Sequence, residues 1–280
     1  MKQAIKNALP QPMFNTLKKA KALFRKNNAR ARRYTRLIRY AGKSVECPFC
    51  GKTFSRFRPT GALERSFWTT PQGRSLLSLD YINVANAMCP WCGSGERHRG
   101  LYFYLLDRIH FPKLKGITLL DVAPDGFLTN QFFRRDDMQY ISMDLSVARH
   151  PNVIMDAIAI GFAESNFDAI ICYHVLEHIK DDVAAIKELF RVLKPGGWAI
   201  IQVPIWVEKT IDDSFVSPEL YENLFGHKDH VRRCGLDYKK RLEMVGFHVK
   251  EDDFIGKLPK DQIERYGLFE TEKIWFCEKT

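Results

Sequence analysis

The alternation of short apolar runs with stretches of helical spacing, which begins near Gly116, limits most strongly what this chain can fold into. Such alternation is typical of a parallel sheet that carries helices on both faces. The helix is clearest at 181–193, where Asp181 or Asp182 can cap the first turn and Pro195-Gly196-Gly197 is expected to end it. We therefore predict an α/β fold whose last two strands form an antiparallel pair. Its seven strands are expected at 117–121, 139–143, 152–155, 168–173, 197–203, 246–251 and 273–277.

Four of the seven cysteines fall into two Cys-x-x-Cys pairs, in CPFCG at 47–51 and CPWCG at 89–93. Each pair lies in a turn with Pro and Gly, so its two sulfurs can face one ion, and Zn²⁺ takes four such ligands in a tetrahedron. Four buried thiols are the alternative. Because protein ligands fill every position, we expect a structural zinc in a zinc-ribbon-like module over residues 45–99. The expected ligands are Cys47, Cys50, Cys89 and Cys92.

Basic residues are concentrated in the first 44 residues, which contain thirteen Lys and Arg and no acid. The rest of the chain has 30 basic and 33 acidic residues, so the net charge of +10 belongs to this basic helical arm, residues 1–44. Phe14, Leu17 and Phe24 fall near one face of its predicted helix. Three uses of the arm stay open: packing on its own domain, association with an anionic membrane surface, and RNA binding.

No apolar run reaches the roughly 18–20 residues that span a bilayer, and no continuous apolar core follows Lys2 and Lys6 as a cleaved signal would require. An odd number of cysteines with a paired spacing also favours metal binding in a reducing compartment over disulfides. We therefore expect a cytoplasmic protein, peripheral at the inner membrane face if the arm binds lipid.

The segment LLDVAPDGFL, 119–128, predicts a strand, a turn and a helix, as in the first unit of a nucleotide-binding sheet. Ala123, Pro124 and Asp125 stand where glycines would let the backbone approach a pyrophosphate, and Asp125 would repel the phosphates. A cofactor without phosphate removes both objections. The loop therefore favours S-adenosylmethionine, a positively charged sulfonium nucleoside, over NAD.

Two acids downstream fit this cofactor. Asp144 ends the second predicted strand, 23 residues after Asp121, and can accept hydrogen bonds from both ribose hydroxyls. Asp156 follows the third strand and can accept from the adenine amino group. Each acid taken alone could equally be a solvated loop residue.

The segments FDAIICYHVLEHI (167–179) and LFRVLKPGGWAIIQVP (189–204) resemble the fourth- and fifth-strand motifs of class I S-adenosylmethionine-dependent methyltransferases. Together with the cysteine pairs, CPWCGSGERHR (89–99), LLDVAPDG and FGHKDHVRRCGLDY (225–238), they resemble a bacterial subgroup with a zinc ribbon ahead of the methyltransferase domain. The resemblance covers about residues 45–280 and implies a Rossmann-like methyltransferase domain over 100–280.

The same resemblance implies cofactor contacts at the ends of successive strands. The implied residues are Asp121, Ala123 and Gly126 for the methionine end, Asp144 and Leu145 for the ribose, Asp156 and Ala157 for the adenine, and Tyr173 and His174 for the reacting methyl. The Tyr173 ring could also face the sulfonium. Ordinary packing under a loop is the alternative for Tyr173 and His174.

Methyl transfer is an in-line displacement, so holding the acceptor in line with the methyl group supplies much of the acceleration. A hydroxyl acceptor must also lose its proton, and a histidine suits that task. The candidates are His174, His227 and His230, the last two in the polar loop GHKDH (226–230), where Asp229 could orient one of them. We favour His230, although each histidine could equally be a surface or packing residue.

Three functions stay open for the acceptor side. Transfer to a hydroxyl of a sugar, glycan or other small metabolite fits the slightly acidic body and the resemblance, and we favour it. RNA methylation is the second, with the basic arm contacting phosphates. The third is a non-enzymatic binding module.

Overall fold

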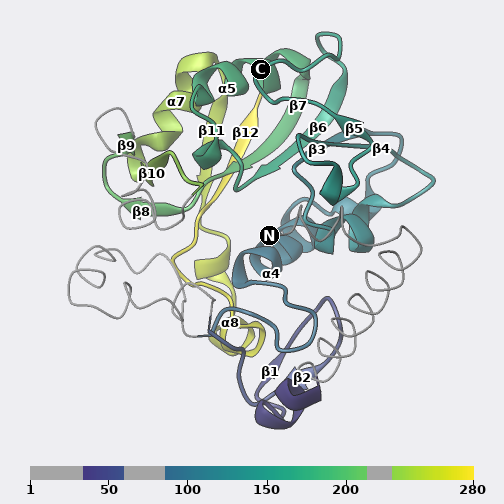
Figure 1. Ribbon diagram of the computed structural model, residues 1–280, viewed down its shortest axis with the longest axis vertical. Coiled ribbons are helices and arrows are strands. Elements are labelled where there is room, and N and C mark those ends of the chain that lie inside the picture. The colour runs from purple at the N-terminus through teal and green to yellow at the C-terminus, as the bar shows by residue number, and fades with distance from the viewer. Residues whose placement is uncertain (1–33, 60–85, 213–228) are drawn as a thin grey trace, which may run out of the picture.

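The computed structural model describes residues 34–59, 86–212 and 229–280 of the chain (Figure 1). Most of the predicted arm helix, with Phe14, Leu17 and Phe24, lies outside the described residues, and so does His227. Within the described ranges, no helix combines the length and the apolar character needed to cross a bilayer.

A seven-stranded sheet forms the centre of the molecule, in the order β11-β12-β7-β6-β3-β4-β5. The strands from β3 to β7 pair in parallel, whereas β12 is antiparallel to both β7 and β11. The predicted α/β sheet and its antiparallel pair are therefore confirmed. The strands are β3 (Thr118–Val122), β4 (Gln139–Asp144), β5 (Val153–Ile154), β6 (Phe167–Tyr173), β7 (Leu193–Gln202), β11 (His248–Asp252) and β12 (Ile274–Glu278).

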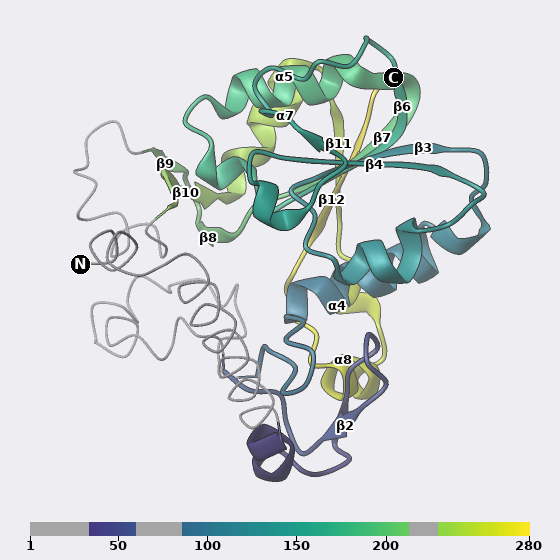
Figure 2. The same ribbon diagram turned by 45° about the vertical axis from the view of Figure 1, so that its right-hand side comes forward.

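Side chains of the inner strands enter two cores, one on each face of the sheet. In β3, Leu119 packs into one core and Leu120 into the other. Helix α4 (Glu96–Phe103) covers the face of Leu119, while α5 (Asp182–Val192) and α7 (Lys239–Val245) cover the face of Leu120 (Figure 2). These strands are buried on both faces, so the sheet forms the middle layer of a three-layer structure.

Helix α5 is the helix predicted at 181–193. Asp181 caps it, because its carboxylate accepts a hydrogen bond from Ala184 N at 2.9 Å. The prediction that Pro195-Gly196-Gly197 ends the helix is wrong. The helix ends before Leu193, whose ψ of 136° is already extended, and the tripeptide lies within β7.

The two cysteine pairs lie in a small module beside the C-terminal helix α8 (Lys260–Tyr266), below the sheet in Figure 1. Its hairpin pairs β1 (Val45–Glu46) with β2 (Thr53–Phe54). Tyr40 is buried in the same core as the cysteines, so the last residues of the predicted arm pack with the module. The fully buried Arg99 fastens the module to the rest, because its guanidinium donates to the carbonyl oxygens of Ala87, Ser94, Tyr266 and Gly267.

Helix α4 begins at Glu96, four residues after the last cysteine of the second pair, Cys92. A second, three-stranded sheet, in the order β8-β10-β9, lies beyond β7 and was not predicted, because its strands are too short to show a period. Its strands are β8 (Ile205–Val207), β9 (Ile211–Asp212) and β10 (Arg232–Gly235). Short helical segments complete the described chain: η2 (Tyr104–Arg108), η3 (Phe111–Lys113), η4 (Thr129–Phe133), η5 (Val147–Arg149), η6 (Leu176–His178), η9 (Leu236–Tyr238) and η10 (Ile255–Lys257).

Candidate active site

Two residues with a left-handed backbone mark the carboxyl edge of the sheet. Ala123 follows β3 with a φ of 56°, and His174 follows the neighbouring β6 with a φ of 58°. Each amide donates to a carbonyl oxygen at the end of an adjacent strand, Ala123 N to Met143 O and His174 N to Gln202 O, both at 2.8 Å. Residues other than glycine adopt this conformation at a cost, and such outliers gather at functional sites.

Side chains rather than glycines hold the loop after β3. Asp121, only 5% exposed, accepts hydrogen bonds from Tyr140 Oη at 2.8 Å and Thr129 Oγ1 at 3.3 Å. Burial raises the pKa of Asp121 to about 7. Gly126 supplies the left-handed turn that follows, with a φ of 85°, and a Cβ there would meet only Asn130 Nδ2, at 4.0 Å. The hydrogen bonds of Asp121 therefore fix the start of the loop, and the loop backbone remains available for contact with a ligand.

Asp125, which stands where a glycine would meet a pyrophosphate, is committed to protein contacts. Its Oδ1 accepts from Phe127 N at 2.8 Å, and its Oδ2 lies 2.8 Å from Nε2 of His98. Because Gly95 N donates to Nδ1 of His98, the hydrogen of that ring is on the nitrogen that faces Asp125. Burial alone would raise the pKa of Asp125, but the contact with His98 holds it below its ordinary value.

His98 lies in α4, directly after the second cysteine pair, so this contact links the cysteine module to the predicted cofactor loop. His98 was not predicted as a site residue. It lies in CPWCGSGERHR, but its partner Asp125 is 27 residues away and no local pattern joins the two.

Asp144 ends β4 at the same edge. Its Oδ1 accepts from Ser146 N at 2.7 Å, and its Oδ2 lies 3.2 Å from Nε of Arg149. That Oδ2 is buried and makes no hydrogen bond to the described residues. A carboxylate oxygen in this position has capacity for a hydroxyl donor from a ligand.

The surface next to Asp144 is apolar. Ala157 is buried, and Asp156 accepts from Ile158 N at 3.1 Å through Oδ1. Half of the exposed large apolar side chains in the described chain lie in or after β4 and β5, where a planar base could cover them. They are Leu145 (67% exposed), Val147 (66%), Ile154 (62%) and Ile158 (42%).

Tyr173, the last residue of β6, donates from Oη to Glu272 Oε1 at 2.9 Å. Burial raises the pKa of Glu272 to about 7 and also raises the pKa of Tyr173. The ring of His174 lies 5.0 Å from the Tyr173 ring, and burial lowers the pKa of His174 to about 4. His174 is therefore neutral at pH 7 and a weaker base than an ordinary histidine.

His230 lies against His178, with ring centroids 4.7 Å apart and planes at 76°. The backbone carbonyl oxygen of Asp229 lies 3.0 Å from Nδ1 of His178, while the Asp229 side chain is exposed. The buried carboxylate of Glu177 lies between His174 and His178, with Oε1 3.4 Å from Nδ1 of His174 and 3.9 Å from Nε2 of His178. Glu177 and His178 were not predicted as site residues, although both lie in the motif FDAIICYHVLEHI.

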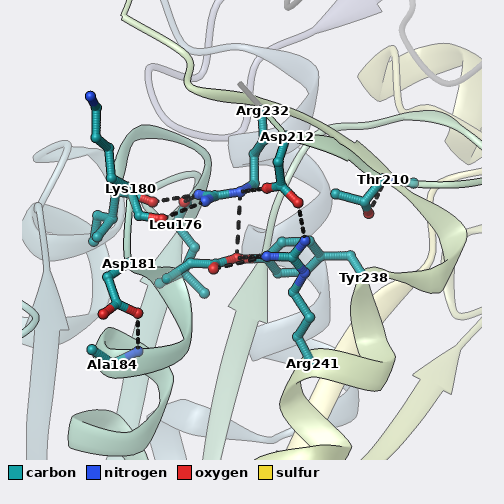
Figure 3. Close-up of polar contacts among 12 residues, drawn as sticks. Leu176, Lys180, Asp181, Ala184, Thr210, Asp212, Arg232, Tyr238 and Arg241 are labelled. Atoms are coloured by element: carbon teal, nitrogen blue, oxygen red, sulfur yellow. Dashed lines mark hydrogen bonds and ion pairs between the residues drawn. The ribbon is translucent and has the colours of Figure 1, made fainter. Parts of the chain in front are cut away.

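A buried ion network holds this part of the edge together (Figure 3). Arg232, 3% exposed, lies 3.0 Å from Asp212 Oδ1 and 3.5 Å from Asp182 Oδ2. Asp182 also accepts from Tyr238 Oη at 2.6 Å and pairs with Arg241. The other guanidinium nitrogens of Arg232 donate to the carbonyl oxygens of Leu176, Ile179 and Lys180, which flank Glu177 and His178.

The four paired cysteines converge, with all four sulfurs within 4.8 Å of one another. The Sγ atoms of Cys47 and Cys92 are 3.6 Å apart and those of Cys50 and Cys89 are 3.8 Å apart. A Zn–S bond of about 2.3 Å in a tetrahedron requires sulfurs about 3.8 Å apart, whereas a disulfide requires about 2.0 Å. Left-handed glycines follow both pairs, Gly51 at φ 62° and Gly93 at φ 85°. The donor set therefore fits zinc.

Comparison with known proteins places the central region in a family. Residues 120–201 match the model of the methyltransferase domain family. An uncharacterized methyltransferase of Schizosaccharomyces pombe is 26% identical over 162 residues, which cover 57% of this chain and 53% of that protein. The ubiquinone biosynthesis O-methyltransferase of Xanthomonas oryzae pv. oryzae is 30% identical over 103 residues, which cover 30% of this chain and 41% of that protein.

Among solved structures, a SAM-dependent methyltransferase from Archaeoglobus fulgidus aligns with 66% of this chain and 95% of its own, at 16% identity and a TM-score of 0.45. The chain thus spans about half or less of the length of the curated relatives it matches.

Proposed function

We propose that this chain, which belongs to the class I S-adenosylmethionine-dependent methyltransferases, transfers a methyl group from that cofactor to a hydroxyl of a sugar, glycan or other small metabolite. The observation that carries the proposal is the convergence at one sheet edge of the braced loop after β3, the Asp144 carboxylate and the Tyr173-His174 turn. In open α/β sheets, ligands bind outside the carboxyl ends of the strands.

The edge supports the cofactor contacts implied by the resemblance. When bound, S-adenosylmethionine supplies an electrophilic methyl group on a sulfonium. Asp144 Oδ2 is available to a ribose hydroxyl, and the exposed Leu145 and Ile158 offer an apolar surface to the adenine. Asp121 is taken up by Tyr140 and Thr129, so we assign it to holding the loop rather than to direct contact with the methionine end.

The acceptor side is supported by the histidines around Glu177. His174 is neutral, and its Nδ1 faces the Glu177 carboxylate, which can stabilise the ring if it takes a proton. His230, our preferred base from the sequence, lies on the other side of His178. A hydroxyl acceptor beside His174 or His230 could pass its proton to that ring. The Xanthomonas relative is named an O-methyltransferase, which also favours an oxygen acceptor.

We further propose that Cys47, Cys50, Cys89 and Cys92 hold a structural zinc ion. The spacing of their sulfurs supports this, and with four protein ligands no coordination position is left for a substrate. The ion would stabilise the module that carries α4 and therefore His98, whose contact with Asp125 reaches the cofactor loop.

The test is methyl transfer from isotopically labelled S-adenosylmethionine to separate glycan, small-molecule and RNA pools, together with calorimetric binding of the cofactor. Label in the glycan or small-molecule pool supports the proposal. Label confined to RNA would favour an RNA methyltransferase, for which the thirteen basic residues of the arm are the supporting observation. Absence of cofactor binding would favour a non-enzymatic module.

A further inference from the structure

Three side chains at the sheet edge form a cluster that the cofactor contacts do not use. Glu177 and His178 lie in η6 after β6, and His230 lies just before β10. One ligand atom from each residue can be chosen so that all three atoms lie within 4.8 Å of one another. Two imidazoles and one carboxylate are a common ligand set for zinc and for first-row transition metals.

Glu177 carries a buried negative charge that the described protein only partly satisfies. Its side chain is 1% exposed, and Oε1 faces histidine nitrogens. Its other oxygen, Oε2, is buried and makes no hydrogen bond to the described residues. A buried carboxylate oxygen without a partner is costly, so the position favours a cation that could occupy it.

The hydrogen bond of His178 prepares the ring to act as a ligand. Its Nδ1 lies 3.0 Å from the carbonyl oxygen of Asp229, which can only accept, so the ring hydrogen is on Nδ1. Nε2 of the neutral ring then carries a lone pair, and this is the atom 3.9 Å from Glu177 Oε1. Histidine ligands of metals are typically oriented by such a bond from the second nitrogen to a backbone carbonyl.

The backbone beneath the cluster is fixed from both sides. Val231 N donates to Glu177 O at 3.0 Å, which joins the segment of His230 to that of Glu177. Arg232 binds the carbonyl oxygens on either side of Glu177 and His178, and is itself held by Asp182 and Asp212 (Figure 3). This support keeps the three donors close without a metal ion, as a preorganised site requires.

We propose that Glu177, His178 and His230 bind a divalent first-row transition-metal ion. Three protein donors leave coordination positions open, as in metal sites that bind substrate or water. The open positions suit oxygen ligands, such as vicinal hydroxyls, an enol or a carboxylate of a small molecule. Lewis-acid activation of an acceptor hydroxyl would be one use of the ion, with His174 rather than the metal-bound His230 as the base, and that role alone rests on the proposed methyl transfer.

The experiment is a Co²⁺ titration of the full-length protein by calorimetry, with cobalt and zinc counted afterwards by elemental analysis. We expect one Co²⁺ per chain to bind while the zinc content of the cysteine cluster stays unchanged. Glu177→Gln, which keeps the side-chain shape, should weaken Co²⁺ binding at least tenfold, and His230→Gln should do the same. His248→Ala, an exposed histidine on β11, is the matched control and should bind as the wild type does.

Binding of S-adenosylmethionine by the variants, measured in parallel, separates this inference from the proposed function. Variants that bind the cofactor normally and have lost Co²⁺ would support the metal site. Wild-type protein that binds no Co²⁺, binding that survives in both variants, or uptake that only displaces zinc would overturn it.

Discussion

Asp144 offers the sharpest test of the cofactor assignment. The substitution Asp144→Ala removes a carboxylate at the end of β4 whose Oδ2 is buried and makes no hydrogen bond to the described residues. Its Oδ1 already accepts from Ser146 N at 2.7 Å. Oδ2, which lies 3.2 Å from Nε of Arg149, can therefore still accept from one ribose hydroxyl, and a second hydroxyl would have to share Oδ1.

The loss of cofactor affinity expected in Asp144→Ala is that of one hydrogen bond to Oδ2. One hydrogen bond to a charged acceptor contributes about 1.5–3 kcal/mol, which corresponds to about ten- to a hundredfold in the dissociation constant of S-adenosylmethionine. The lost contact with Arg149 adds little to stability, because the Arg149 side chain is 54% exposed. Asp144→Asn keeps one acceptor oxygen and should retain part of the affinity.

The assay is calorimetric titration of the cofactor into wild type, Asp144→Ala, Asp144→Asn and the control Asp136→Ala, an exposed acid before β4. Urea unfolding of each variant separates a loss of affinity from a loss of fold. If folded Asp144→Ala binds S-adenosylmethionine as tightly as Asp136→Ala does, the ribose assignment is rejected.

Metal analysis of the purified protein should find one zinc per chain at the cysteine cluster and less in Cys50→Ser, since the four sulfurs have tetrahedral spacing; wild-type protein with neither zinc nor iron would contradict this. Burial raises the pKa of Asp121 from 3.8 to about 7. The contribution of protonated Asp121 to the free energy of unfolding is therefore fully present below about pH 4 and is lost as the pH rises to about 7. Urea unfolding of the cofactor-free protein at pH 5 and pH 7.5 should therefore show a smaller loss of stability in Asp121→Asn than in wild type, and an equal loss would refute the raised pKa. Removing residues 1–33, which leaves the buried Tyr40 in place, should abolish salt-sensitive sedimentation with anionic vesicles and leave transfer to a soluble acceptor unchanged. Equal sedimentation of both proteins would remove the membrane hypothesis, and a loss of turnover only on RNA would favour RNA methylation.

The sheet could be predicted from the sequence because buried strands appear as short apolar runs. Leu119 and Leu120 enter opposite cores, so β3 is apolar at successive positions, and such an apolar run is visible in the chain without knowing any partner. The cysteine cluster was predictable for a similar reason, since each Cys-x-x-Cys turn is complete within five residues. The end of α5 was not, because Pro195-Gly196-Gly197 fits a helix stop as well as the bent start of β7.

The parts of the site that escaped prediction depend on contacts between distant segments. Glu177 is next to His178 in the chain, but it was not recognisable as a site residue because its burial and its proximity to His230, 53 residues later, appear only in the folded structure. Arg232, which fixes both segments, looks in sequence like one more basic residue in VRRCG, and nothing local shows that it is 3% exposed. The burial of a polar group against a distant partner leaves no repeating pattern in the sequence, so it cannot be predicted locally.

A contact with a distant residue also changes the electrostatics of the glycine-poor loop after β3. In the sequence, the negative charge of Asp125 is expected to repel a pyrophosphate, and Ala123 and Pro124 are expected to keep it away from the backbone. The pair with His98 Nε2 at 2.8 Å keeps Asp125 ionised but directs its charge toward α4. Charge repulsion of a phosphate is weaker than the sequence suggested, and steric crowding by Ala123 and Pro124 becomes the stronger ground for a cofactor without phosphate. Since His98 follows the second cysteine pair directly, the module that the cysteines organise also sets where that charge points.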